Sequence, residues 1–268
     1  MALGLYRNVK FIDEDGDTYG IRHSVNRPIM VSVGHGEAIA EGSLAGHSSI
    51  GKFGHNTDVG TAWETVWHGS NLKTYLSTAE RLQIASDDVD DDGAPLDTGA
   101  RTVLVTGLDD DYAVITETVT MNGTTNVLTD DAFIRPSLSV VTAGSSGTNE
   151  GTITASNNAD STVLSQIEPG EGESHCACYT VPAGYTAYVN MVILSESSTK
   201  GSEFGVFVRT FGGLWKMKYG VTLLDSAIPV KRSIPIKLPE KTDIAVRAKG
   251  IIAGAYVTAV LMGWMEAN

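Results

Sequence analysis

Residues 101–125, RTVLVTGLDDDYAVITETVTMNGTT, contain the features that decide the fold. The segments 101–108 and 112–121 are rich in Val, Ile and Thr, whose branched side chains favour a pleated sheet over a helix. The aspartates between these segments and the Asn122–Gly123 pair after them have the chemistry of tight turns. The stretch therefore predicts antiparallel strands joined by short turns, with a hairpin at Asn122–Gly123.

The same pattern extends outward from this stretch in both directions. The only helical periodicity, at 61–84, is short and is interrupted by HGSN. Further strands with turn residues between them are expected at 125–129, 137–144, 151–156, 185–195, 203–211, 214–224, 233–239, 242–250 and 255–266. Many short strands at regular spacing are typical of sandwiches and jelly rolls. We predict an all-β fold with two β-sandwich or jelly-roll-like domains and an extended N-terminal arm.

The division into domains follows from the polar segment 156–174, which contains Gly and Pro and predicts a linker. We expect a β-rich domain at 46–155 and a C-terminal β-sandwich at 175–268. Residues 1–45 have strand-like pieces without a pattern that would close a core of their own. They are expected either to form an arm that adds strands to a neighbouring chain or to supply the first strands of the first domain.

Charge excludes some classes of partner. The 268 residues carry a net charge of −13, from 19 basic and 32 acidic side chains. The sequence has no cluster of Lys and Arg of the kind that neutralises phosphates, so we expect no direct contact with nucleic acid. No apolar run approaches the ~20 residues that span a bilayer, and the N-terminus has no apolar core of a secretory signal. We expect no membrane partner and synthesis in the cytosol.

Motifs of the common enzyme classes are missing from the sequence. It has no HExxH pair of a metalloprotease, no GxSxG nucleophile turn and no GxxxxGK[ST] phosphate loop. We therefore predict a protein that is not an enzyme and that needs no cofactor.

The acidic stretch SDDVDDDGAPLDTGA, residues 86–100, is the main candidate for an ion site. Asp88, Asp90 and Asp92 have the alternating spacing of a calcium loop. The position where an EF-hand places its closing glutamate is Gly99, which has no ligand to offer. The alternatives are a calcium loop of another kind and a hydrated loop tip. The missing ligand favours the hydrated loop, so no metal site is predicted.

Cys176 and Cys178 lie in the segment HCACY. On an extended strand their Cα atoms would be ~6.5–7 Å apart, at the outer limit for a disulfide. His175 beside them would serve a zinc ion only if further Cys or His joined it, and the sequence places no second cluster nearby. We predict two buried thiols rather than a disulfide or a zinc site.

Aromatic side chains crowd the segment 204–219. Packing in a core is the simpler interpretation of these residues. The alternative is an aromatic surface that binds a sugar or faces another subunit.

Several segments resemble a family of virion structural proteins of tailed bacteriophages, especially phages of aquatic bacteria. They are FGHNTDV (53–59), TGARTVLVTGLD (98–109), ETVTMNGTT (117–125), TAGSSGTNEGTI (142–153), VPAGYTAYV (181–189) and KLPEKTDIAVRAKG (237–250). The resemblance covers about residues 45–268 and rests on scaffold and turn patterns. It implies a virion location, with the major capsid protein or other virion proteins as partners, and it suggests a homotrimer.

Composition and resemblance together favour a non-enzymatic structural protein. We predict a capsid decoration or cement protein that stabilises the head by bridging capsomers. The alternatives are a tail, adaptor or fibre-base component, and a carbohydrate-binding module for attachment to the host.

Overall fold

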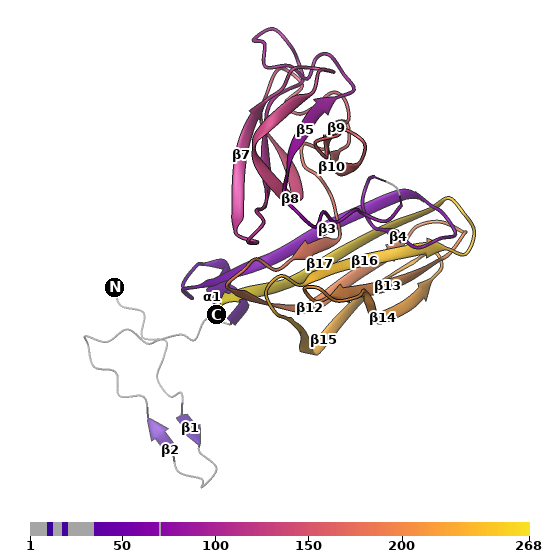
Figure 1. Cartoon of the computed structure of the whole chain (residues 1–268). Helices are drawn as coiled ribbons and strands as arrows, with labels where there is room; N and C mark the ends of the chain where they lie inside the picture. Colours follow the sequence, from indigo (N-terminus) through magenta and orange to yellow (C-terminus); the bar gives the residue numbers. More distant parts are fainter. Residues whose placement is uncertain (1–9, 13–17, 21–34, 70) are drawn as a thin grey trace, which may run out of the picture.

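The computed structural model describes residues 10–12, 18–20, 35–69 and 71–268. The predicted all-β fold is confirmed, since antiparallel sheets dominate and the described residues include a single short helix, α1 (His35–Ala40). Among the described residues, the strands β1 (Lys10–Ile12) and β2 (Thr18–Gly20) pair with each other and with no further strand. Most of the predicted N-terminal arm, residues 1–9, 13–17 and 21–34, lies outside the described residues. The rest of the chain forms two β modules with separate hydrophobic cores (Figure 1).

The first module spans residues 80–167 and is one six-stranded antiparallel sheet in the order β10-β9-β5-β8-β6-β7. Its strands are β5 (Glu80–Ser86), β6 (Ala100–Leu108), β7 (Val114–Thr120), β8 (Val127–Ala143), β9 (Ile153–Ser156) and β10 (Val163–Ile167). The core forms because alternate residues of these strands turn inward, as Val103 and Val105 of β6 do, to pack with Leu82, Ile84 and Phe133.

One predicted hairpin of this module forms and the other does not. Strands β6 and β7 pair from Thr102↔Thr120 to Leu108↔Val114, as their sequence predicts. The predicted hairpin at Asn122–Gly123 is wrong, because β6 lies between β7 and β8 in the sheet. The tight turn itself is present, since the Thr125 amide donates to the Asn122 carbonyl at 3.0 Å and Gly123 has φ of +54°. The dipeptide specifies the turn, but the pairing with β6 decides where β8 lies.

Strand β8 merges two predicted strands and changes partner along its length. Its first part pairs with β5 as far as Phe133, and from Ile134 it pairs with β6. At the change of partner, Arg135 has φ of +56° and Pro136 lacks an amide hydrogen for the ladder. The resulting bend turns the Arg135 side chain toward the second module, where it ion-pairs with Asp243.

The second module is a β-sandwich, and it contains all six strands expected in the C-terminal half. One sheet has the order β15-β12-β17-β3 and the other β11-β16-β13-β14, with β4 added to β16. The strands are β3 (His47–Val59), β4 (Glu64–Thr65), β11 (Cys178–Thr180), β12 (Tyr185–Glu196), β13 (Ser202–Arg209), β14 (Lys216–Leu223), β15 (Ser226–Leu238), β16 (Asp243–Gly250) and β17 (Ala255–Ala267). Alternate residues of both sheets, such as Val257 and Leu261 of β17 and Phe204 and Val206 of β13, form the shared core.

Strand pairing divides the chain differently from the ranges expected from the sequence. Strand β3 pairs with β17 from His47↔Glu266 to Val59↔Ala255, so residues 47–59 belong to the second module rather than to a domain at 46–155. Strand β10 lies inside the expected linker 156–174 and pairs with β9. The first module is thus inserted between β4 and β11 of the second.

Independent folding of the two modules stays a prediction. The weak helical signal at 61–84 corresponds to β4 and β5.

Candidate functional site

The inserted topology makes the chain pass between the modules twice. The first crossing comprises residues 66–69 and 71–79, and the second crossing comprises residues 168–177. The two crossings lie side by side, because Trp67 forms a bridge with Cys176 and the Ala177 amide donates to the Val66 carbonyl at 3.0 Å. The cavity, the two buried cation groups and the histidine cluster described next lie on these crossings or at the surfaces that they join.

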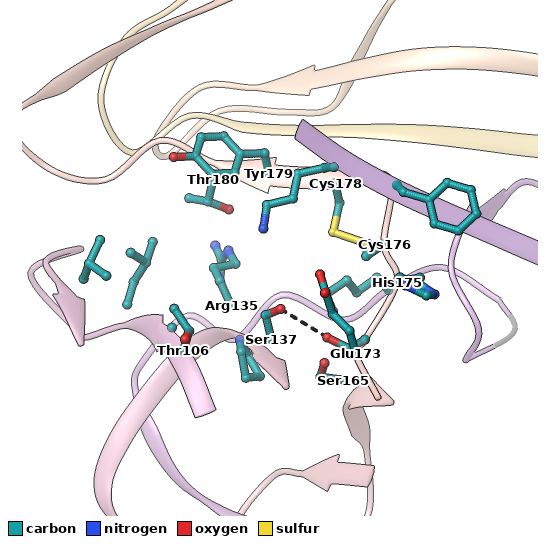
Figure 2. Close-up of a pocket in the computed structure, with 18 of the residues that line it drawn as sticks. Thr106, Arg135, Ser137, Ser165, Glu173, His175, Cys176, Cys178, Tyr179 and Thr180 are labelled. Carbon is teal, nitrogen blue, oxygen red and sulfur yellow. Dashed lines mark hydrogen bonds between the residues drawn. A yellow bond between two sulfur atoms is a disulfide. The ribbon is translucent and has the colours of Figure 1, made fainter. Parts of the chain in front are cut away.

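A cavity of about 440 Å³ lies between the modules. Figure 2 shows Thr106, Arg135 and Ser137 of the first module on one side and Tyr179 and Thr180 of the second module on the other. The second crossing forms a further wall and contributes residues 173–176. The charged residues that line it are Lys52, Lys73, Arg135 and Glu173, so cations outnumber anions.

A buried ion cluster joins the modules beside this cavity, which Arg135 and Thr180 of the cluster also line. Asp243, the first residue of β16, accepts hydrogen bonds from Arg135 Nε at 2.9 Å, Arg209 Nε at 2.9 Å and the Thr180 hydroxyl at 2.6 Å. The side chains of Asp243 and Arg135 are only 4% and 8% exposed. Both guanidinium groups lie over the ring of Tyr75, 4.8 and 4.9 Å from its centroid. Charge-assisted hydrogen bonds in this largely buried setting therefore connect the two modules.

Lys73 is a second buried cation of this region. Its ammonium group donates to the Leu164 carbonyl and lies 4.7 Å from the centre of the Trp67 ring. Burial, followed by the charges of Arg135 and Lys52, lowers the pKa of Lys73 to about 7. Burial thus favours the neutral form of this side chain more than it is favoured in an exposed lysine.

Three histidines and a glutamate meet where the crossings touch. His55 comes from β3, His68 from the first crossing, and Glu171 and His175 from the second. The Glu171 carboxylate lies 3.2 Å from His55 Nε2, 3.2 Å from His68 Nε2 and 2.8 Å from His175 Nδ1. The Nε2 atoms of His55 and His68 also contact each other. We call these four residues the His–Glu cluster.

Aromatic packing positions the rings of the His–Glu cluster. Phe53 of β3 stacks on His55 and meets His175 edge-on, with centroid distances of 5.6 and 5.0 Å. His68 is almost fully buried, and burial together with His55 lowers its pKa to about 4. The Nδ1 atoms of His55 and His68 are buried without a hydrogen-bond partner among the described residues. The polar contacts of these two rings therefore all pass through Nε2.

The sequence did not predict the His–Glu cluster, because its members are separated by up to 120 residues and come from segments with no metal-binding spacing. The one available signal was the pair Glu171 and His175, four residues apart beside the cysteines. Within the described part of the chain, this cluster is the single place where three or more potential metal ligands gather within 4.8 Å.

Asp88, Asp90 and Asp92, the alternative calcium ligands weighed from the sequence, do not converge in this way. Asp88 Oδ1 accepts a hydrogen bond from the Asp90 amide, and Asp92 Oδ1 accepts one from the Ala94 amide, each at 2.9 Å. These are local turn contacts that use carboxylate oxygens within the loop.

Asp91 differs from the expectation of a hydrated loop, since its side chain is fully buried. Its carboxylate accepts hydrogen bonds from the Ser86 hydroxyl at 2.6 Å and the Ala100 amide at 2.7 Å. It also accepts bonds from the amides of Glu150 and Gly151, each at 2.9 Å. Four donors replace the water that a buried carboxylate loses, so no cation is needed to hold it there.

The prediction of two reduced thiols is wrong, because Cys176 and Cys178 form a disulfide. Their Cα atoms are 5.2 Å apart, well below the separation expected on an extended strand. The reason is that β11 begins only at Cys178, and the chain bends at Ala177. With both sulfurs bonded to each other, neither is a thiolate ligand for a metal.

Several aromatic residues at 204–219 pack against arginines. Arg247 lies 4.6 Å from the centre of the Phe207 ring and 4.4 Å from that of Trp215. Phe211 is exposed and meets Tyr112 of the first module edge-on. Packing thus accounts for Phe207 and Trp215, while binding of a sugar at this surface stays a prediction.

No protein-family model matches the chain, and no curated protein matches it either. Among solved structures, that of the Gx strain of infectious bursal disease virus is 11% identical, with 82% of this chain and 80% of that chain covered and a TM-score of 0.14. The VP2 subviral particle of the same virus is 9% identical, with coverages of 84% and 82% and a TM-score of 0.14. TM-scores at this level establish neither a shared fold nor a shared function.

No helix within the described residues is long and apolar enough to cross a membrane.

Proposed function

We propose that this chain is a non-enzymatic virion structural protein of a tailed bacteriophage that decorates the capsid and bridges neighbouring capsomers. The observation that carries the proposal is the resemblance of six sequence segments, spread over residues 45–268, to proteins of this class. In this role the two modules form a rigid unit that is repeated by the symmetry of the particle.

The open edges of the second module support a role in assembly. Strands β14 and β15 end their sheets, with no further strand beside them in the described part of the chain. Strand β15 is 13 residues long, and such an edge offers unpaired backbone groups to another chain. Near these edges, Leu214 and Ile234 are 80% and 78% exposed. A subunit contact would cover this apolar surface, and in our proposal the contact forms a homotrimer.

The joint between the modules suits a protein that bears load. The Asp243 ion cluster connects β8 of the first module to β13 and β16 of the second. A head that holds packed DNA pushes outward on anything that bridges its capsomers. A bridging protein with a stiff joint resists this displacement better than one with a flexible linker.

The decisive test is the position and copy number of the chain in intact particles. Electron microscopy of virions that carry a labelled version of the protein should show the label over the whole head, in many copies. A few copies confined to the tail or its vertex would replace the cement role with the tail, adaptor or fibre-base alternative. Light scattering of the purified chain should give the mass of three subunits.

A further inference from the structure

We propose that His55, His68, His175 and Glu171 bind one divalent transition-metal ion of the zinc class, which fastens the two crossings to each other and to β3. This inference is independent of the proposed function, because it rests on the geometry of the His–Glu cluster alone. The ligand atoms would be Nε2 of His55 and His68, Nδ1 of His175 and one or both oxygens of Glu171.

Hydrogen bonding alone does not satisfy the contacts within the cluster. His55 Nε2 and His68 Nε2 each lie 3.2 Å from a Glu171 oxygen, and the two nitrogens also contact each other. If both Nε2 atoms carry a hydrogen and donate it to the carboxylate, their two N–H groups also face each other as two donors. If one of them lacks hydrogen, that nitrogen and the carboxylate oxygen face each other as two acceptors. A cation between the three groups satisfies every contact, because each atom then offers it a lone pair.

The distances from the Glu171 carboxylate to the three imidazoles are close to those of tetrahedral coordination. Bonds of 2.0–2.1 Å from zinc to nitrogen and oxygen place tetrahedral ligand atoms ~3.3 Å apart. The Glu171 carboxylate oxygens lie 3.2, 3.2 and 2.8 Å from the three imidazole nitrogens. The carboxylate therefore lies near the required separation from each imidazole, and binding would move the Nε2 atoms of His55 and His68, which contact each other, apart to the same spacing.

The donor set selects the class of metal. Three imidazoles with one carboxylate match zinc and its neighbours in the first transition row, whereas calcium and magnesium prefer a shell of oxygen atoms. The nearby sulfurs of Cys176 and Cys178 are joined in a disulfide and provide no thiolate. Four protein ligands leave no open position for substrate, which is the arrangement of structural rather than catalytic zinc sites.

The position of the cluster indicates what the ion would do. The chain enters the first module through the first crossing, which carries His68, and leaves it through the second, which carries Glu171 and His175. The remaining ligand, His55, is on β3 of the second module. A bound ion would close the base of the inserted module and hold it against the sandwich.

The test uses the full chain, stripped of metal with a chelator and checked by elemental analysis. Titration with Zn²⁺ at pH 7.5 should give one ion per chain in calorimetry. At a hundredfold excess over the dissociation constant, the midpoint of thermal unfolding should rise by about 5 °C or more. Co²⁺ in place of zinc should give the visible absorption of a four-coordinate site. A wild-type chain that takes up neither ion overturns the proposal.

Variants locate the bound ion. Glu171→Gln and His175→Gln alter partly exposed side chains and should lose the one-to-one binding and the thermal shift. The matched control is His47→Gln, on the same strand as His55 but outside the cluster, which should bind zinc as the wild type does. Equal binding by all three variants would overturn the proposal. Should either cluster variant fail to fold, the cobalt spectrum of the wild type still decides.

A second control separates the cluster from the cysteines. The double variant Cys176→Ser/Cys178→Ser should retain the zinc stoichiometry, because the proposed ligands are unchanged. Loss of zinc in this folded variant, together with its retention in Glu171→Gln, would assign the ion to thiolates and overturn the proposal.

Discussion

At the scale of single residues, Asp91 carries the largest number of buried polar contacts in the acidic stretch. Removing its carboxylate in Asp91→Ala would leave one hydroxyl and three amides without their acceptor. Each unsatisfied buried donor costs ~1–3 kcal/mol, so we expect a loss of at least ~3 kcal/mol in the free energy of unfolding. Urea denaturation measures this loss. The matched control, Asp90→Ala, changes an exposed side chain and should shift stability by no more than ~0.5 kcal/mol; equal losses in the two variants would contradict the role of Asp91.

The same loop gives a prediction about calcium. Because Asp88, Asp90 and Asp92 spend oxygen atoms on local turns and do not converge, millimolar calcium should leave the unfolding temperature unchanged relative to a chelator. Calorimetry on the two samples makes the comparison. A rise of several degrees that disappears when these aspartates become asparagines would establish a calcium site.

Lys73 gives a prediction about pH. Burial lowers its pKa from 10.5 to about 7 in the folded state, so folding must bury a charge below about pH 7. This penalty is relieved as the pH rises from about 7 toward 10.5, where the folded chain has released a proton that the unfolded chain still holds. Because of Lys73, the free energy of unfolding should therefore rise by ~1.4 kcal/mol per pH unit between pH 7 and 9. Urea unfolding of wild type and Lys73→Met at several pH values isolates the effect, and parallel pH curves would contradict it.

At the scale of elements, the strands with strong alternation could be predicted from the sequence. β6, β7 and the six strands β12–β17 have β-branched or aromatic residues between clear turn signals, and all of them except β15 form close to their expected places. β15 begins at Ser226, whereas the sequence predicts a start at residue 233. β3 was missed because HSSIGKFGHNTDV contains few large apolar residues and two glycines. Its partner β17 lies about 200 residues later in the chain, and no local pattern records such a pairing.

The candidate site was harder to predict than the strands for the same reason. The ligands of the His–Glu cluster belong to β3 and to the two crossings, which become neighbours only after the first module is inserted. The disulfide was missed because the bend at Ala177 depends on hydrogen bonds to Val66 and Val246, on two other segments. Local sequence rules describe turns and strand faces, whereas these features depend on long-range packing.

Gly54 of β3 packs closely against the backbone of both crossings. A Cβ atom at this position would lie 2.2 Å from the Val66 carbonyl oxygen and 2.3 Å from the Ala177 nitrogen, so Gly54→Ala would push against the backbone of both crossings. We expect a loss of ~2–4 kcal/mol in the free energy of unfolding. Gly51→Ala on the same strand is the matched control, because a Cβ there meets nothing within 4 Å. Denaturant curves should separate the two variants, and similar stabilities would show that the crossings can move apart freely.

At the scale of the whole molecule, the long edge strand β15 can pair with a neighbouring subunit in an assembly, and it can also pair with other chains in aggregation. Pro229 and Pro235 interrupt its amide groups, a feature that limits uncontrolled pairing along an edge. Ile234 between them is nonetheless 78% exposed, and in our proposal the subunit contact covers it. Full burial of such a side chain is worth ~1.5–3 kcal/mol per subunit.

If β15 forms the subunit contact, Ile234→Lys should break the proposed trimer. The substitution would place a charge in an apolar contact, and three symmetric copies would bring three such charges into the interface. Light scattering coupled to size exclusion should then report a monomer, while circular dichroism still shows the folded sheets, because the side chain contributes little to the core of its own chain. The matched control is Leu96→Lys, at a loop position 93% exposed on the first module, which should leave the assembly intact. A trimer that survives Ile234→Lys would place the contact elsewhere, and a wild-type chain that is monomeric at all concentrations would remove the trimer from the proposal altogether.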